Sequence, residues 1–393
     1  MAANEVLICG AARTPMGGLL GALSSVPAPQ LGATAITAAL EKAGVAGSEV
    51  DAVLMGCVLA AGLGQAPARQ AARAAGISDR AVCSTINKMC GSGMQALILG
   101  HDQIRAGSCH TLVAGGMENM SQAPYLLPKA RAGMRMGHGE IIDSMFLDGL
   151  EDAYEGGLMG VFAQRSADDY QISRDAMDEF AIGSLNKALA ATESGAFVAE
   201  TAAVTVAQRG NNVQVRVDEQ PGLARPDKIP LLKPAFKKDG TITAANASSI
   251  SDGASALLLS SESYALQQGL QPIARIVAHA SHAQLPAEFT LAPIGAIRSV
   301  LEKAGWHKDE VDLFEINEAF AVVSLLAIQQ LALDQKKVNV FGGACALGHP
   351  LGSSGARIVV TLINALQQRG LKKGIASLCI GGGEATAIAI ELV

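Results

Sequence analysis

The order of apolar and polar positions predicts alternating strands and helices in the first part of the chain. Apolar runs at residues 6–12, 50–55 and 111–117 predict strands. Residues 31–44 and 66–76 carry apolar side chains at helical spacing and end at a glycine, which predicts a helix between successive strands. Such alternation predicts a parallel sheet covered by helices.

One turn in this first part carries a cysteine. Residues 81–86 predict a buried strand, Cys90 follows it, and helical spacing then continues to Gly107. A helix N-terminus offers unpaired N–H groups and partial positive charge, so this position favours a thiolate. Considered alone, however, the pattern is more typical of a small buried cysteine that packs beside Gly91 and Gly93.

The middle of the chain, residues 120–250, lacks this alternation. Proline and glycine residues interrupt a stretch that bears methionine and arginine, and a polar helix capped by Ser173 then runs to about Ser194. Alternating residues at 204–217 and a passage rich in proline and lysine at 226–238 follow. We therefore predict an insertion rather than a continuation of the sheet.

The last part of the chain repeats the first. Four short segments recur in the same order: residues 40–44 as 301–305, 49–51 as 310–312, 91–92 as 352–353, and 115–116 as 381–382. Several matches in order indicate two related halves. A duplicated fold would make equivalent loops face each other, and residues near Cys90 would then meet residues near His349.

Three further positions lie where strands of the second half end. His349 occupies a loop between a strand and a helix, Cys379 lies on an apolar strand that opens into residues 381–383, and Asn317 follows another strand. Ligands bind at the carboxyl ends of strands in open α/β sheets. Each position also has a purely structural interpretation, as a turn, a core cysteine and a helix N-cap, but their convergence with Cys90 favours a site.

Composition and charge exclude several classes of protein. The chain has 393 residues, 49% hydrophobic and 17% charged, with a net charge of −6, which argues against long disorder and against a nucleic-acid partner. No uncharged apolar run reaches the roughly 18 residues that cross a bilayer. Seven cysteines without a CxxC pair predict neither a disulfide scaffold nor a zinc site. With no signal peptide before the first strand, we expect a cytoplasmic protein without a metal.

The residues resemble the thiolase family over the whole chain. The motifs that carry the resemblance are the Cys90 turn, GGMENMS at 115–121, NAS at 246–248, NEAF at 317–320, GHP at 348–350 and CIGGG at 379–383. The resemblance implies an α/β thiolase fold, in which two duplicated βαβαβαββ halves form a layered α/β/α/β/α core. It implies an N-terminal half of residues 1–119 and 251–272, an inserted loop domain of residues 120–250, and a C-terminal half of residues 273–393.

The resemblance also implies a reaction and the residues that perform it. Cys90 would carry the acyl group, His349 would take its proton, and Cys379, with a thiol pKa near 8.5, would remove the α-proton of a second thioester. His349 with Asn317, the latter through a water, would form one oxyanion hole, and the N–H groups of Cys90 and Gly381 the other. The implied enzyme is an acetyl-CoA C-acetyltransferase that joins two acetyl-CoA into acetoacetyl-CoA and CoA, and reverses this by thiolysis. No prosthetic group is expected.

Coenzyme A would bind mainly to the inserted segment. The implied binding residues are Ser248 at the pantetheine arm, Met159 and Phe320 at the acyl pocket, and Arg225 at the nucleotide phosphates. Leu150 and Ala319 are also expected to contact the substrate or coenzyme A. Many biosynthetic members have His-Met-Gly where this chain has Leu158-Met159-Gly160. This departure leaves the usual selectivity for short acyl chains open.

Three alternative functions follow from the same residues. A degradative 3-ketoacyl-CoA thiolase of broader chain length would use the same site. A decarboxylating condensing enzyme would pair a cysteine with two histidines, but Asn317 stands where the second histidine is expected. A non-catalytic acyl-CoA-binding or scaffold member would lack Cys90, His349 or Cys379, and all three are present. In this family a loop such as residues 121–145 joins two dimers, so the resemblance implies a homotetramer that is a dimer of dimers. Alternatively, this loop is an ordered lid over the site.

Overall fold

A ten-stranded sheet forms the centre of the protein. In the computed structural model, which describes residues 5–208 and 210–393, its strand order is β12-β13-β14-β11-β1-β10-β5-β3-β4, with β2 beside β10. Residues 1–4 of the predicted N-terminal half and residue 209 of the alternating segment lie outside the described residues. The strands of this sheet are β1 Val6–Arg13, β2 Gly17–Gly18, β3 Ala52–Gly56, β4 Val82–Ile86, β5 Thr111–Asn119, β10 Ser251–Ser261, β11 Ala274–Ala283, β12 Leu313–Ile316, β13 Lys373–Ile380 and β14 Glu384–Leu392.

Helices cover both faces of this sheet and fill the space between its two halves. They are α1 Ala28–Ala43, α2 Pro67–Ala74, α3 Ser92–Arg105, α4 Met159–Asp169, α5 Arg174–Glu193, α6 Glu219–Leu223, α7 Glu262–Gln268, α8 Ala292–Ala304, α9 Ala321–Leu331, α10 Ala344–Leu347 and α11 Leu351–Arg369. The helices and strands predicted from the apolar pattern are present, with bounds shifted by a few residues.

The sheet is mixed, so the prediction of a parallel sheet was wrong. Strand β3 runs parallel to β4 and β5, and β12 runs parallel to β13. Strand β10, however, is antiparallel to both β1 and β5, because the chain returns from the inserted segment between them. Strands β13 and β14 are antiparallel because only residues 381–383 connect them, too few for a parallel crossover.

Strand β4 forms one edge of the sheet, which corrects the prediction that it is buried. It pairs only with β3, and its first residue, Val82, is 69% exposed. An apolar run of this length does not distinguish a central strand from an edge strand.

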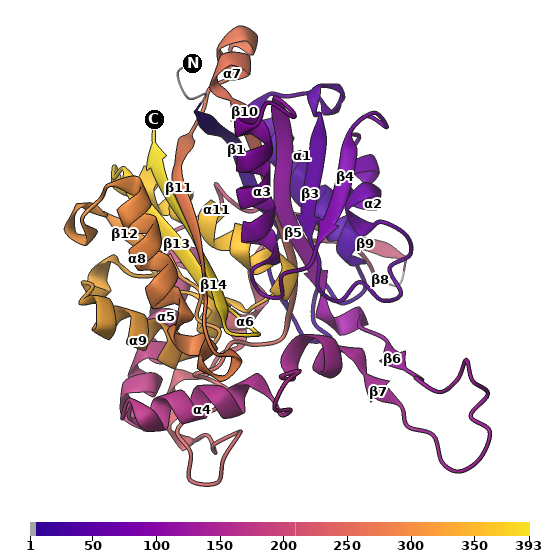
Figure 1. Cartoon of the computed structure of the whole chain (residues 1–393), viewed down its shortest axis with the longest axis vertical. Coiled ribbons are helices and arrows are strands. Elements are labelled where there is room, and N and C mark those ends of the chain that lie inside the picture. Colours follow the sequence, from indigo (N-terminus) through magenta and orange to yellow (C-terminus); the bar gives the residue numbers. More distant parts are fainter. Residues whose placement is uncertain (1–4, 209) are drawn as a thin grey trace.

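The two halves stack into five layers. Among the described residues, the two half-sheets pair where Leu7 lies opposite Arg275 and Ile8 lies opposite Ala274. Helix α11 packs on β5 and β10 of the first half and on β12 and β13 of the second, and α3 lies beside it (Figure 1). Helices α1 and α2 cover the outer face of the first half-sheet, and α8 covers that of the second. This α/β/α/β/α arrangement confirms the predicted fold class.

The repeated sequence segments have the same local structure in both halves. Helices α1 and α8 end at Gly44 and Gly305, with φ of 66° and 67°. In each half a carboxylate then accepts a hydrogen bond from the main chain three residues earlier, Glu49 from Ala46 at 2.8 Å and Glu310 from His307 at 2.7 Å. Only glycine adopts the left-handed conformation freely, so the shared glycine has a backbone reason.

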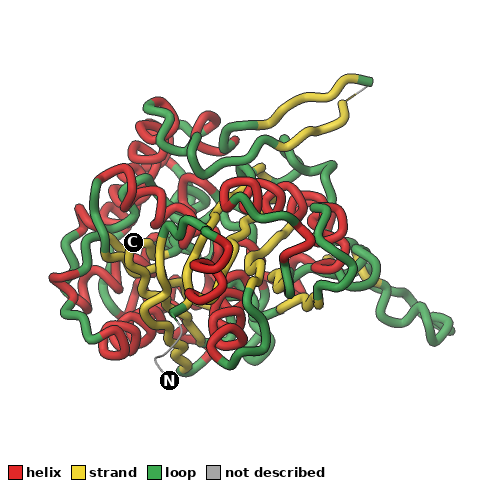
Figure 2. The backbone as a smooth tube through the Cα atoms, turned by 90° about the horizontal axis from the view of Figure 1, so that it is seen from above, coloured by secondary structure: helices red, strands yellow, loops and turns green. Residues whose placement is uncertain are grey.

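The inserted segment lies against both halves and extends two arms. Ser173 caps α5 as predicted, because its Oγ accepts from the N–H of Ala176 at 3.1 Å. One arm is a hairpin of β8 Val204–Gln208 and β9 Asn211–Val215, and the other is the loop between β6 Tyr125–Leu126 and β7 Ile142–Asp143 (Figure 2).

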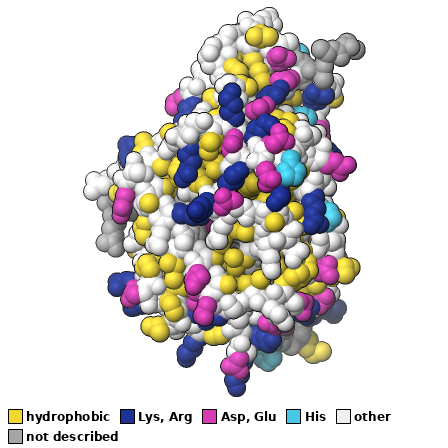
Figure 3. All heavy atoms as spheres, turned by 90° about the vertical axis from the view of Figure 1, so that its left-hand side faces the viewer, with side chains coloured by type: hydrophobic (Ala, Val, Ile, Leu, Met, Phe, Trp, Pro, Cys, Tyr) yellow, Lys and Arg dark blue, Asp and Glu magenta, His cyan; other side chains and the backbone are white. Residues whose placement is uncertain are grey.

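The surface of the second half carries charges of both signs. On this face, Lys and Arg side chains alternate with Asp and Glu, and apolar side chains lie between them (Figure 3). Such mixing gives no extended basic surface on this face, unlike a nucleic-acid-binding protein. Within the described ranges, every helix is too short or too polar to cross a bilayer.

Candidate active site

One cavity of about 410 Å³ gathers most of the predicted site residues. Cys90 reaches it from the turn before α3, and His349 from the loop before α11. Cys379 and Gly381 reach it from the end of β13. The turns before α3 and α11 occupy equivalent places in the two halves, so the duplication brings a sulfur and an imidazole to one cavity, as predicted.

The Cys90 turn packs against a side chain of the second half. A Cβ atom on Gly91 would lie 2.3 Å from Cδ1 of Ile380, the end of a flexible side chain, so Ile380 would have to move. The hydroxyl of Ser92 accepts from the N–H of Lys88 at 2.8 Å, which closes the turn. Glycine at position 91 therefore lets Ile380 of β13 pack directly on this turn.

The Cys90 thiol is less acidic than its place before a helix predicts. Burial raises its pKa to about 11, while the N–H groups of Gly381 and of Cys90 itself act in the opposite direction. Loss of solvation thus outweighs these two hydrogen bonds. The same two N–H groups flank the sulfur, where they are placed to bind a developing oxyanion.

His349 is held in a defined tautomer by Ser354. The hydroxyl of Ser354 donates to the carbonyl of Pro350 at 3.0 Å, so it accepts from Nδ1 of His349, 2.6 Å away. This pattern assigns the proton to Nδ1 and leaves the lone pair on Nε2, which has no partner among the described residues. Burial and the charge of Arg357 lower the pKa of His349 to about 3, so the ring is neutral and can accept a proton.

The sequence analysis did not identify Ser354. Its signal was available, because Ser354 lies one helical turn after Pro350 at the start of the predicted helix, where a hydroxyl can reach back to the preceding loop.

Cys379 is less acidic than expected. Burial raises its pKa well above the usual thiol value, and a negative charge on Cys90, which lines the same cavity, would raise it further. The sequence predicts an ordinary thiol pKa for this residue. The low-polarity wall of the cavity explains the difference, since none of the described residues that line it is a lysine or an arginine.

Gly381 and Gly383 differ in what they allow. A Cβ on Gly381 would find Cε of Met159 as its nearest neighbour, at 3.8 Å, so the position opens into the cavity. A Cβ on Gly383 would lie 2.5 Å from the carbonyl oxygen of Gln284, at a φ of 86°. Gly381 therefore leaves space for a ligand, whereas Gly383 is required by the backbone.

Asn317 lies behind the cavity wall rather than on it. The residue is fully buried, its N–H donates to the carbonyl of Ser377 at 3.0 Å, and neither polar atom of its amide has a partner among the described residues. It does not cap the following helix, because the N-cap of α9 is Phe320. Unpartnered buried amides are commonly satisfied by water, so this placement is compatible with action through a water.

The remaining wall of the cavity is mostly apolar. It includes five of the residues expected to bind the substrate or coenzyme A: Leu150, Met159, Ser248, Ala319 and Phe320. Phe236 and Phe289, which the sequence analysis missed, pack edge-to-face on Phe320 with ring centroids 6.1 and 6.2 Å away. Leu158 also lines this wall.

Arg225 does not line the cavity. It lies on a neighbouring hollow of about 330 Å³ together with Lys228. The two spaces share Ala244 and Ser249 as lining residues, so they adjoin each other. Arg225 is the N-cap residue of a short 3-10 helix, Pro226–Leu231, and from this position it lines the second hollow.

Comparison with known proteins identifies the family. The thiolase N-terminal domain matches residues 6–263 and the thiolase C-terminal domain matches residues 270–392, so the chain belongs to the thiolase family. A probable acetyl-CoA acetyltransferase of Dictyostelium discoideum is 49% identical over 99% of this chain and 94% of its own length. The acetyl-CoA acetyltransferase of Escherichia coli is 48% identical over 99% of both chains.

Solved structures agree with this assignment. The acetyl-CoA acetyltransferase of Bacillus anthracis superposes with a TM-score of 0.97 at 43% identity, over the whole of both chains. The Acat5 thiolase of Ascaris suum, in complex with coenzyme A, superposes with a TM-score of 0.94 at 42% identity, over 99% of this chain and 100% of that one.

Proposed function

We propose that the protein is an acetyl-CoA C-acetyltransferase, which condenses two acetyl-CoA into acetoacetyl-CoA and CoA and catalyses the reverse thiolysis. The observation that carries the proposal is that Cys90, His349 and Cys379, from two duplicated halves, line one apolar cavity. The names of the relatives in Dictyostelium and Escherichia coli support the choice of acetyl-CoA.

In the first half-reaction, Nε2 of His349 takes the proton from the Cys90 thiol. The sulfur attacks the thioester carbonyl, and the N–H groups of Cys90 and Gly381 bind the oxyanion. The carbon–sulfur bond to CoA then breaks, and CoA leaves as a thiol with the proton from His349. Because the resting pair is a neutral thiol and a neutral imidazole, the proton moves only as the substrate reacts.

In the second half-reaction, the thiolate of Cys379 removes the α-proton of a second acetyl-CoA. His349, with Asn317 acting through a water, stabilises the enolate, whose carbon attacks the acyl group on Cys90. The bond between the acyl group and the Cys90 sulfur breaks, and the proton that Cys379 took passes to the Cys90 thiolate. This transfer restores the Cys90 thiol and the Cys379 thiolate. An acylated Cys90 cannot ionise, so it cannot oppose the ionisation of Cys379 at the step that needs the Cys379 thiolate.

Coenzyme A enters the reaction as substrate and product, and we propose no prosthetic group. Ser248 would contact the pantetheine arm, because a hydrogen bond from its N–H to the carbonyl of Ala319, 2.9 Å long, holds it on the cavity wall. Arg225 and Lys228, on the adjoining hollow, would face the nucleotide phosphates. The coenzyme A complex of the Ascaris thiolase supports this class of ligand.

The division of the chain and its location are also proposals. Pairing of β10 with β1 and β5 supports a first half of residues 1–119 and 251–272, with residues 120–250 inserted and residues 273–393 as the second half. Seven free cysteines support a reducing compartment such as the cytoplasm.

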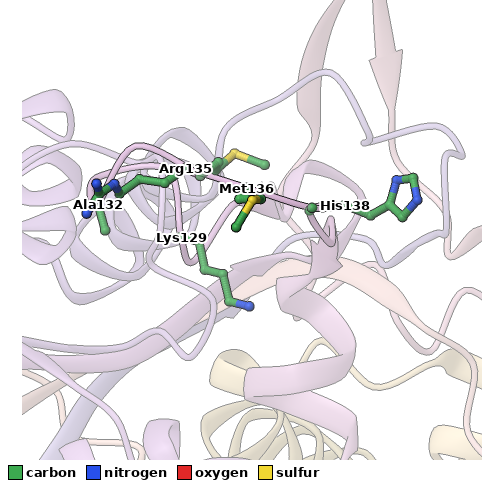
Figure 4. A pocket seen from close by; sticks show the side chains of 8 residues that line it. Lys129, Ala132, Arg135, Met136 and His138 are labelled. Atoms are coloured by element: carbon green, nitrogen blue, oxygen red, sulfur yellow. The ribbon is translucent and has the colours of Figure 1, made fainter.

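We propose that the arm between β6 and β7 joins dimers into a homotetramer. Its apolar side chains face solvent, with Met136 at 97% exposure and Ile141 at 68%. Lys129, Arg135 and His138 project from the same loop (Figure 4). Replacing residues 129–139 by a short Gly-Ser linker should halve the mass measured by light scattering. An unchanged mass would support a lid instead.

A second candidate is thiolysis of longer 3-ketoacyl-CoA substrates. Leu158 favours it, because an apolar side chain lines the cavity where many biosynthetic members carry a histidine. The ratio of kcat/KM for acetoacetyl-CoA to that for a C8 ketoacyl-CoA decides between the two. A preference for acetoacetyl-CoA supports the first proposal.

Covalent labelling with radioactive acetyl-CoA tests the mechanism. Cys90→Ala should lose the label, and Cys379→Ala should retain it while losing condensation. Cys83→Ala is a matched control, because it removes another half-buried thiol outside the cavity and should behave as the wild type. Label that persists in the Cys90 variant would overturn the proposal, and label absent from the wild type would favour a non-catalytic acyl-CoA-binding protein.

A further inference from the structure

Three side chains of the kind that bind metals meet at the end of α3 opposite the Cys90 turn. His101 and Asp102 belong to α3, and His279 belongs to β11 of the second half. Figure 1 shows α3 in the first half and β11 in the second, and the contact between the two imidazoles links them. The histidines are half-buried and Asp102 is exposed, so water reaches the cluster.

The ligand atoms of the cluster form a nearly equilateral triangle. Nδ1 of His101 lies 3.0 Å from Oδ1 of Asp102, Nε2 of His279 lies 2.9 Å from the same oxygen, and the two nitrogens are 3.2 Å apart. Zinc ligands at about 2.0–2.1 Å from a tetrahedral ion lie about 3.3–3.4 Å from one another. A small outward movement of the three groups would therefore make room for an ion.

Protons alone do not satisfy all three contacts. If both ring nitrogens carry a proton, both donate to Asp102, but two N–H groups then face each other across 3.2 Å. If the facing nitrogen of His101 is unprotonated, its lone pair faces the carboxylate oxygen at 3.0 Å. A cation at the centre binds all three lone pairs at once.

We propose that His101, Asp102 and His279 bind a divalent transition-metal ion of the zinc class, with water completing its coordination. Two imidazoles and one carboxylate are a ligand set typical of zinc with an open position. The ion would join α3 of the first half to β11 of the second. The sequence analysis expected no metal because it considered only the cysteines. This site is independent of the proposed acyl transfer.

Zinc titration of metal-free protein against a chromophoric chelator tests the site. The titration uses the full chain with Cys90→Ala and Cys379→Ala, so that the cavity thiols do not bind zinc. We expect one tightly bound zinc ion per chain. Loss of a supporting group around a metal ligand weakens binding about 10–100-fold, so removing a ligand with His279→Ala should weaken it at least about tenfold.

Two further variants complete the test. His282→Ala is the matched control, because this histidine lies on the same strand but its Nε2 faces Gln284, 3.2 Å away. It should leave zinc affinity unchanged. Asp102→Asn removes the exposed ligand without risk to the core and should also weaken binding. Zinc affinity that is unchanged in Asp102→Asn and His279→Ala, or reduced equally in His282→Ala, would overturn the proposal.

Discussion

Both terminal nitrogens of Arg13 contact the carboxylate of Asp218, at 2.7 and 2.8 Å, and neither side chain is more than 2% exposed. The Nε of Arg13 lies 2.5 Å from Glu200. Glu200 in turn accepts a hydrogen bond from Asn364 of α11 at 2.8 Å. Arg13 belongs to β1, whereas Glu200 and Asp218 belong to the inserted segment. One buried guanidinium therefore joins the inserted segment to the central sheet by ion pairs.

Arg13→Met should lower the free energy of unfolding by about 3–5 kcal/mol, because it leaves two carboxylates buried without their cation. Urea unfolding followed by circular dichroism measures this loss. Arg275→Met is the control, since its ion pairs with Glu5 and Glu391 are partly exposed and should contribute less than about 1 kcal/mol. Equal losses in the two variants would contradict the role assigned to Arg13.

Gly381→Ala should fold normally and lose activity. The added methyl has space in the empty cavity but occupies the path of the thioester, so kcat/KM should fall by about 100-fold, the effect typical of a disturbed oxyanion hole. Gly383→Ala should behave in the opposite way and lower the melting temperature, because its methyl meets the main chain of Gln284. A lower melting temperature in Gly381→Ala would show that the fold itself requires glycine at position 381, and would contradict a role in leaving space for the thioester.

Ser354→Ala should lower kcat by about 10–100-fold, part of what a general base contributes, because His349 loses the partner that fixes its tautomer. KM should change little, since Ser354 does not line the cavity. The matched control is Ser353→Ala. Ser353 is the neighbour of Ser354 on α11, and its buried hydroxyl oxygen lies 2.8 Å from that of Ser255 on β10. A similar loss of kcat in the control would point to a structural effect.

The rate at which Cys90 is alkylated should continue to rise as the pH is raised above about 8.5. Its pKa is raised to about 11, so the thiolate fraction, and with it the rate, should rise about tenfold per pH unit beyond the usual thiol pKa of about 8.5. Mass spectrometry of the Cys90 peptide after iodoacetamide treatment, in Cys379→Ala, measures this rate. A plateau near pH 8.5 would show that the helix N-terminus outweighs burial.

The sequence predicted the location of the site better than its chemistry. Cys90 and His349 could be placed together because the repeat makes their turns equivalent, and Cys379 followed from its strand and glycines. The ionisation states could not be predicted, because they depend on burial by side chains from all three parts of the chain. The same limit applies to Asn317 and Arg225, whose positions relative to the cavity wall depend on tertiary packing.

The strand pattern shows a similar limit. Alternation of strands and helices predicted a layered fold, which the structure confirms. It did not reveal that β10 runs antiparallel between β1 and β5, because that direction depends on where a chain returns after an insertion of more than a hundred residues. The exposure of Val82 likewise depends on which strand lies at the edge.

The equivalence of the turns before α3 and α11 has an evolutionary consequence. An ancestor built from two identical halves would have carried the same side chain at both turns, and a symmetric pair of that kind offers either two nucleophiles or two bases. Fusion into one chain freed each copy to change alone, so that one turn now supplies sulfur and the other an imidazole. The asymmetry on which the chemistry depends is thus a product of gene duplication.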